Sequence, residues 1–192
     1  NTKGRLGLSS ILINNGTRIP ADCLAVSGGW SPNVHLTCHH RGRPIWNDAI
    51  AGFVPGRTLP DGMIVVGAAS GTMGLSSCLK DGIIAGQKVD RDLGKKPAKT
   101  RIPRASDEDF SIQPFWHVKD SINHAFVDFQ HDVCVKDIKQ AHREGFRSVE
   151  HLKRYSTLGM ATDQGKIANI PGLAVLADIS GKTIAETGTT IF

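Results

Sequence analysis

The sequence predicts an α/β protein in which a strand, a glycine-rich turn and a helix precede a small helical domain. Three observations predict this class. Four consecutive apolar residues at 63–66 lead into a run of small residues, and apolar positions at helical spacing follow. A turn signal near residue 15 separates two short apolar segments. Beyond residue 130, apolar residues recur at helical spacing between residues that favour helix caps.

Composition is that of a globular protein. The 192 residues suit one large or two small domains, and 40% of them are hydrophobic. No apolar run approaches the ~20 residues that span a bilayer, and the amino end lacks both a Met and the apolar core of a signal peptide. The four cysteines form no C-x-x-C pair, which indicates reduced thiols. We therefore expect a cytoplasmic protein with no membrane segment.

The first expected elements are two short antiparallel strands. The segment SILI is followed by NNGT, in which Asn-Asn-Gly can supply the positive φ angles of a hairpin turn. We expect the second strand to continue into the apolar residues 23–26 and to be buried there on both faces. The segment SGGWSPN then predicts a loop, and residues 33–60, rich in His, Gly and Pro, predict an irregular excursion.

The segment MIVVGAASGTMGLSSCLKDGIIAGQKV predicts a strand, a tight turn and a helix. A helix amino terminus offers free N–H groups and the positive end of its dipole to a phosphate or a ribose. The glycines of this segment before the helix are Gly67, Gly71 and Gly74. The glycines do not form G-x-G-x-x-G, so close packing of helix on strand explains the small residues equally well.

Residues 93–116 mix charge and proline and are expected to be a linker. Much of the net charge of +5 lies in its block KKPAKTRIPR. Two interpretations stay open for this block: a solvated linker, because runs of like charge usually remain exposed, or a contact for an acidic partner or a phosphate.

The last part of the chain predicts short helices. The segment VKDIKQAHREG places Val135, Ile138 and Ala141 on one helix face. Ser148 is expected to cap a second helix, and Thr162 could cap a third.

The first half resembles the closing part of two-dinucleotide-binding flavoprotein reductases, which are of Rossmann type. The similarity lies in the order of hairpin, Ala-Asp, apolar strand, G-x-x-P-N and a later strand that ends in Gly-Ala. In that family the last strand ends in Gly-Asp, and its aspartate binds the ribityl chain of FAD. Here Gly67 is followed by Ala68. The resemblance therefore implies NAD, with the amino-terminal fingerprint expected upstream of Asn1. It also implies the candidate cofactor-binding residues, which lie in the turn and the first helical turn: Gly67, Ala68, Ala69, Gly71, Met73 and Leu75.

The helical segment resembles the small [2Fe-2S] module of bacterioferritin-associated ferredoxins, which reads C-x-C, two helices and G-M-x-x-C-Q-G-x-x-C. The four ligand positions of that module fall on Asp128, Gln130, Asp163 and Ala168. Because a cluster needs thiolate ligands, the resemblance implies a domain that keeps this fold and binds no iron-sulfur cluster. Cys134 lies where the first helix begins and fits an ordinary small apolar residue.

Longer stretches resemble the alpha subunit of heterotetrameric sarcosine oxidases: SGGWSPNVHL with VVGAASG, and FVDFQHDV with EGFRSVEHLKRYSTLGMATDQGK. The resemblance implies an oxidoreductase that converts sarcosine and O2 to glycine and hydrogen peroxide, with 5,10-methylenetetrahydrofolate formed from tetrahydrofolate. It implies NAD on alpha, FMN at the interface with the beta subunit and FAD on beta. Tetrahydrofolate would bind a carboxyl-terminal domain of alpha absent from this chain. Gamma and delta subunits complete the implied partners.

The same resemblance implies a division of the chain into four parts. Residues 1–92 would belong to the NAD-binding domain, 93–116 to the linker and 117–170 to the cluster-free helical domain, with 171–192 leading toward the folate-binding domain. No catalytic residue is assigned, and the fragment alone is expected to be inactive.

Two alternative functions stay open. A related opine, proline or cyanide-forming dehydrogenase would keep the architecture, although such relatives generally retain the cluster cysteines. A helix-turn-helix DNA reader needs base-contacting residues where its second helix starts, and this chain has Val149, Glu150 and His151 there. We therefore expect no nucleic-acid partner.

One cluster of possible metal ligands is also set aside. It comprises His35, Cys38, His39 and His40, which lack the separated pairs of a structural zinc site, so no metal site is expected.

Overall fold

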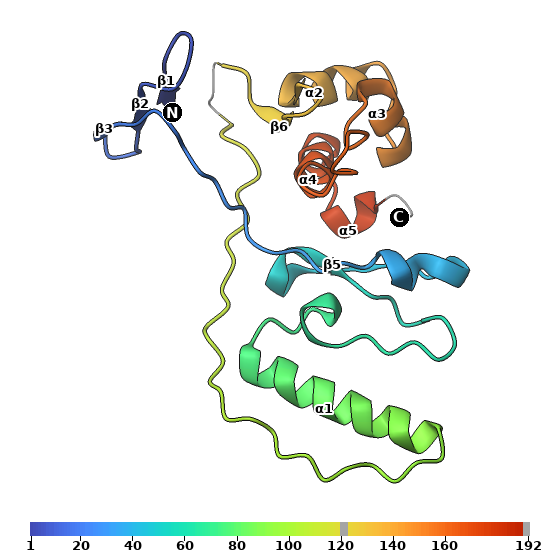
Figure 1. Cartoon of the computed structure of the whole chain (residues 1–192). Helices are drawn as coiled ribbons and strands as arrows, with labels where there is room; N and C mark the ends of the chain where they lie inside the picture. Colours follow the sequence, from blue (N-terminus) through green and yellow to red (C-terminus); the bar gives the residue numbers. More distant parts are fainter. Residues whose placement is uncertain (120–122, 190–192) are drawn as a thin grey trace. The chain divides into compact units, whose positions relative to one another are not determined.

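The computed structural model describes residues 1–119 and 123–189 (Figure 1). Short strands, 3-10 turns and α-helices alternate along the chain, which agrees with the predicted mixed α/β class. The chain divides into two compact units, residues 1–30 and 31–192, which are described separately. Within the described ranges, no helix combines the length and the hydrophobicity needed to cross a bilayer.

The amino-terminal unit is an antiparallel sheet of three short strands, β1 (Thr2–Lys3), β2 (Ser10–Leu12) and β3 (Arg18–Pro20). The hairpin predicted from Asn-Asn-Gly is confirmed, with Ile11 opposite Ile19. In its turn, the Asn15 side chain accepts a hydrogen bond from the Thr17 N–H at 3.0 Å. Such Asx turns are a common way to close a hairpin.

Residues 23–26 do not form the predicted buried strand. They have no regular structure, and Leu24 and Val26 are 46% and 82% exposed. A strand that is buried on both faces needs neighbouring strands and covering layers. The three-stranded sheet of this unit ends at Pro20, so in the described residues nothing pairs with 23–26. The prediction was wrong because apolar composition does not supply a pairing partner.

Residues 33–60 are more regular than predicted. They contain a second hairpin, formed by β4 (Ile45–Asn47) and β5 (Gly52–Val54) with η2 (Asp48–Ile50) between them. The 3-10 helix η1 (His35–Arg41) precedes this hairpin. Trp46 lies opposite Phe53, with ring centroids 5.1 Å apart in an edge-to-face contact. The Asn47 side chain accepts a hydrogen bond from the Ala49 N–H at 3.0 Å. Strands of three residues are too short for alternation to reveal them in a sequence.

The predicted helix after the glycine-rich turn is confirmed, and the predicted strand before it is not. The turn η3 (Gly67–Ser70) leads into α1 (Leu75–Asp92), the longest helix of the structure (Figure 1). Residues 63–66 form no strand, although Val66 has extended backbone angles. As at 23–26, extended backbone without a neighbouring strand leaves the ladder hydrogen bonds unmade. Residues 95–118 contain no helix or strand.

The helical region begins with a short hairpin of two strands, β6 (Phe126–Asp128) and β7 (Val133–Cys134). Four helices follow: α2 (Val135–Arg143), α3 (Val149–Ser156), α4 (Asn169–Ser180) and α5 (Ile184–Thr187), as far as the structure describes the chain. Helices α2, α3 and α4 pack together (Figure 1) around Ile138, Leu152 and Leu176, which are fully buried. Val135 and Ala141 are buried on the same face of α2, as predicted.

The predicted cap of the second helix is confirmed, because the Ser148 hydroxyl accepts a hydrogen bond from the His151 N–H at 3.2 Å. The predicted cap of the third helix is wrong. That helix begins at Asn169, and the Thr162 hydroxyl donates to Gln130 Oε1 at 2.7 Å instead. Residues 159–168 form turns because glycines with positive φ interrupt them. Residues 120–122 and 190–192 of the predicted domains lie outside the described residues.

Candidate functional site

The glycine-rich turn before α1 has the left-handed backbone that its glycines allow. Gly67 and Gly71 have φ of 64° and 93°, and the Gly71 N–H donates to Ala68 O at 3.1 Å. A Cβ at position 71 would lie 2.7 Å from Val54 Cγ1, so a larger residue would be strained and crowded. The turn is therefore a compact reversal that brings small residues to the start of the helix.

The six predicted cofactor-binding residues follow one another through this turn. Leu75 is the first residue of α1 and is 60% exposed, and Ala68 is also exposed. The others are half-buried: Gly67, Ala69, Gly71 and Met73. Their contact with a dinucleotide stays a prediction.

A carboxylate from the linker occupies the start of α1. The N-cap residue Gly74 has no side chain, and instead Asp107 accepts hydrogen bonds from the Ser77 N–H at 3.1 Å and the Ser77 hydroxyl at 2.6 Å. The hydroxyl of Ser77, followed by the backbone N–H groups of Ser77 and Ser76, lowers the pKa of Asp107 against a small opposing effect of desolvation. The charged form of Asp107 is thus held at the positive end of the helix dipole.

This role of Asp107 was not predicted from the sequence, because residues 93–116 were assigned to a linker and contacts were considered only for the basic block within it. One signal was available: a helix that starts with Gly and has no acidic residue in its first turn needs acceptors from elsewhere. Which distant carboxylate would supply them could not be inferred from the order of residues.

Asp107 also decides which part of a dinucleotide the turn would suit. The N–H groups of Ser76 and Ser77 already point at a carboxylate, so a phosphate placed there would meet a negative charge. Ribose hydroxyls can instead donate to a carboxylate, and the small residues Ala68 and Ala69 leave room for close approach. The donor and acceptor set therefore fits a nucleoside better than a pyrophosphate.

At the first of the four cluster-ligand positions, Asp128 acts as an acceptor for backbone groups. Its side chain is buried, and Oδ1 accepts from the N–H groups of Gln130 at 2.9 Å and His131 at 3.3 Å. Its Oδ2 accepts from the Gly159 N–H at 2.8 Å. Asp128 therefore ties the β6–β7 turn to the loop that follows α3.

The other three positions also have structural partners. Gln130 accepts from Thr162, and Asp163 accepts from the N–H groups of Gly165 at 3.2 Å and Ile167 at 3.3 Å. Ala168 is buried in the core. Within the residues that the structure describes, no group of three or more His, Cys, Asp or Glu side chains is arranged to hold a metal ion. Backbone hydrogen bonds and apolar packing hold these loops where a cluster would need four thiolates.

Cys134 is a buried thiol at the start of α2. Its N–H donates to Asp137 Oδ2 at 2.7 Å, and its Sγ lies 3.7 Å from His124 Nδ1. Desolvation by burial and then the charges of Asp137 and Asp132 raise the pKa of Cys134. The neutral thiol is favoured, which suits a packing residue rather than a nucleophile or a metal ligand. All four cysteines are free.

Comparison with known proteins places this architecture in a family. A family model described as the sarcosine oxidase A3 domain matches residues 122–192. The sarcosine oxidase subunit alpha of Rhizobium meliloti (strain 1021) is 40% identical over the whole chain, and that of Corynebacterium sp. (strain P-1) is 33% identical over 91% of it. The chain is homologous to sarcosine oxidase alpha subunits. It spans about a fifth of the length of these relatives, 20% and 19% respectively.

A solved structure shares the fold. The crystal structure of L-proline dehydrogenase from P. horikoshii resembles the chain with a TM-score of 0.73 and 17% identity, covering all of this chain and 40% of that one. At this identity the likeness concerns the fold alone. The helical region of this chain matches the sarcosine oxidase A3 domain, which does not favour the alternative of a helix-turn-helix DNA-binding domain.

Proposed function

We propose that the chain forms an internal part of the alpha subunit of a sarcosine oxidase. The complete assembly would oxidise the N-methyl group of sarcosine with O2, giving glycine and hydrogen peroxide, and would form 5,10-methylenetetrahydrofolate from tetrahydrofolate. The observation that carries this proposal is the 40% identity to a sarcosine oxidase alpha subunit over the entire chain. Beta, gamma and delta subunits would be its partners, in the cytoplasm.

Within that assembly the chain would contribute dinucleotide binding and scaffold rather than catalysis. NAD would lie against the glycine-rich turn, with Leu75 and Met73 as an apolar wall and with Ala68 and Ala69 allowing close approach. FMN would lie at the interface with beta, FAD on beta and tetrahydrofolate on another domain of alpha. The left-handed turn at Gly67 and Gly71 and the exposed Leu75 support the placement of NAD.

A pair of leucines at the two ends of α1 allows a matched test of the NAD site. Leu75 and Leu93 are 60% and 65% exposed, so Leu75→Glu and Leu93→Glu add the same charge at similar solvent exposure. In the full-length subunit, Leu75→Glu should lower the NAD retained through purification about tenfold, since a buried contact would be replaced by a charge. Leu93→Glu should leave it unchanged. Equal losses would place NAD elsewhere.

The helical domain would retain the fold of a [2Fe-2S] module without its cluster. The hydrogen bonds of Asp128, Gln130 and Asp163 support this, because they occupy the ligand positions with groups that iron-sulfur clusters do not use. Iron analysis and visible absorbance of the purified assembly test it. Stoichiometric iron bound to this domain would refute it.

The substrate is tested in the assembled enzyme. Sarcosine should drive O2 consumption and release of hydrogen peroxide, whereas L-proline should not reduce an artificial electron acceptor at a comparable rate. The L-proline dehydrogenase fold is the one observation that favours a second candidate, a dehydrogenase of this architecture. Proline oxidation without sarcosine oxidation would establish that candidate instead.

A further inference from the structure

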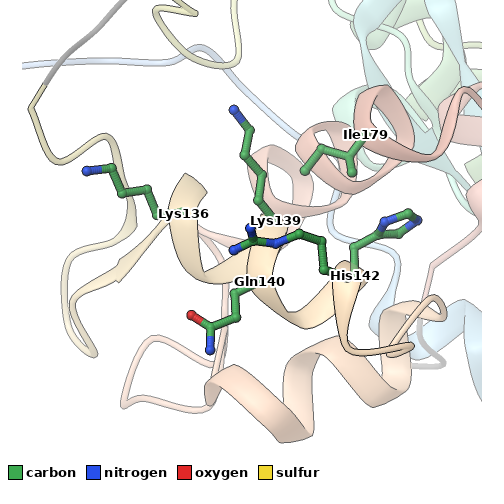
Figure 2. Close-up of a pocket in the computed structure, with 6 residues that line it drawn as sticks. Lys136, Lys139, Gln140, His142 and Ile179 are labelled. Atoms are coloured by element: carbon green, nitrogen blue, oxygen red, sulfur yellow. The ribbon is translucent and has the colours of Figure 1, made fainter.

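A cationic groove lies between α2 and α4, away from the candidate dinucleotide turn. It has a volume of about 520 Å³, and the residues that line it are Lys136, Lys139, Gln140, His142 and Arg143 of α2 and Ile179 of α4. Figure 2 shows the labelled side chains of α2 projecting from the helix and Ile179 on the neighbouring helix. No carboxylate lines this groove.

The cations of the groove form no ion pair within the described part of the chain. The ion pairs found there join Lys119 to Asp178 and Arg154 to Glu150, and neither involves a groove residue. The nearest acids in sequence are Asp137, whose Oδ2 accepts a hydrogen bond from the Cys134 N–H at 2.7 Å, and Glu144, which accepts one from Gln140 at 2.9 Å. Gln140 and Tyr155, and to a smaller extent Arg143, lower the pKa of Glu144. Two carboxylates, Asp137 and Glu144, thus lie on or beside α2 without lining the groove, against three permanent cations in it.

This arrangement opposes the stability of α2. Lys136 lies in the first turn, where the helix dipole disfavours a cation. Lys139 and Arg143 are four residues apart, and Lys136 and Lys139 are three apart, spacings at which like charges repel on a helix surface. Arg143 in the last turn complements the dipole, but Lys136 and Lys139 have no such benefit. A partner that carries negative charge would remove this repulsion.

The spread of the cations indicates the shape of that partner. Lys136 and Arg143 are seven residues apart, which is about 10 Å along the helix axis. In Figure 2 the amino groups of Lys136 and Lys139 point in different directions. The groove is also partly apolar, because Ile179 forms one wall. An extended polyanion with an apolar side chain satisfies both features.

We propose that this groove, formed by α2 and Ile179, binds an acidic peptide segment of another polypeptide chain. Carboxylates spaced along the segment pair with Lys136, Lys139 and Arg143, and an apolar side chain of the segment packs on Ile179. Nucleic acid satisfies the charge but offers no aliphatic side chain for Ile179. This inference concerns a surface separate from the proposed NAD site and does not depend on the identity of the oxidised substrate.

Fluorescence anisotropy tests the proposal on the full 192-residue chain, with a labelled ten-residue peptide of glutamates around two central leucines. The double variant Lys136→Glu and Lys139→Glu should weaken peptide binding about tenfold or more, because attraction becomes repulsion at the contact. The control, Lys95→Glu with Lys96→Glu, changes the net charge equally on exposed linker residues and should weaken binding less than about twofold. Circular dichroism should show the same helix content in all variants.

Several outcomes would overturn the proposal. Equal weakening by both double variants would mean that net charge alone attracts the peptide. Tighter binding of a single-stranded oligonucleotide of equal charge would assign the groove to nucleic acid. Complete displacement of the peptide by inorganic phosphate, at a phosphate concentration equal to the dissociation constant of the peptide, would assign the groove to a small anion. Replacing the two leucines by serines tests the apolar contact, and unchanged affinity would contradict the role of Ile179.

Discussion

Asp128 lies at a position that the resemblance matches to a cluster ligand, and its side chain binds backbone N–H groups there. It accepts hydrogen bonds from the backbone N–H groups of Gln130, His131 and Gly159. The bond from Gly159 joins segments that are 31 residues apart in sequence. A buried carboxylate is stable only when its lone pairs are satisfied by such donors. The loop after α3 therefore depends on Asp128 more than on the exposed residues around it.

Asp128→Ala should lower the free energy of unfolding by about 2 to 3 kcal/mol, because it leaves backbone donors, one of them buried, without an acceptor. Gln130→Ala, which removes one exposed side-chain contact, should cost less than about 1 kcal/mol. Urea denaturation followed by circular dichroism measures both. Equal effects of the two substitutions would contradict the central role of Asp128.

Cys134 should react slowly with alkylating reagents in the native protein. Its pKa is raised by burial and by Asp137 and Asp132, and only the thiolate attacks an alkylating reagent. In the native protein, iodoacetamide should modify the exposed Cys23 at least about tenfold faster than Cys134, and the two should react alike in denaturant. Mass spectrometry of timed samples measures the rates. Rapid native modification of Cys134 would show an activated thiol.

At the scale of elements, the start of α1 depends on a residue far along the chain. Gly74 cannot cap the helix, and Asp107, 30 residues beyond Ser77, supplies the acceptor. A Cβ at position 74 would lie 2.3 Å from Asp107 Cγ, so the glycine and the carboxylate require each other. The linker is thereby attached to the helix that carries the candidate NAD turn.

The pH dependence of this cap follows from the lowered pKa of Asp107. A carboxyl group whose pKa is depressed in the folded state stabilises the fold above its unfolded pKa, here 3.8, and loses that contribution as the pH falls through the lower folded value. The Ser77 amide resonance should therefore titrate with a midpoint below 3.8 in NMR spectra. Asp107→Asn should abolish this titration, and Asp109→Asn should leave it unchanged. A midpoint above 3.8 would contradict the cap.

At the scale of the whole molecule, helices and turns predominate over sheet in the described residues. Its sheets contain two or three short antiparallel strands in the described residues, and residues 23–26 and 63–66 remain unpaired. A dinucleotide-binding domain of Rossmann type depends on a parallel sheet whose strand ends form the site. The homologous alpha subunits are about five times longer than this chain.

The isolated chain should therefore bind NAD weakly or not at all. Isothermal titration calorimetry should give no measurable heat at NAD concentrations that saturate the full-length alpha subunit, because one turn and one helix supply only part of a closed site. Tight binding by the isolated chain would show that the glycine-rich turn and Asp107 suffice.

Local patterns in the sequence determined the amino-terminal hairpin, helix α1, the buried face of α2 and the cap at Ser148. Each depends on residues within about one or two turns of each other, where spacing alone decides which side chains share a face. The resemblance to cluster-binding modules likewise identified, from the sequence alone, the four positions matched to cluster ligands: Asp128, Gln130, Asp163 and Ala168.

Only the tertiary structure decided which apolar segments become strands and which distant side chains meet. Residues 23–26 and 63–66 have the composition of strands but lack partner strands in the described residues. Helix α4 begins at Asn169 and not after the predicted cap at Thr162, because turns lie between these two residues. The contacts of Asp107 with Ser77 and of Asp128 with Gly159 join segments about 30 residues apart. Pairing and long-range capping depend on how the chain returns on itself, which local sequence does not encode.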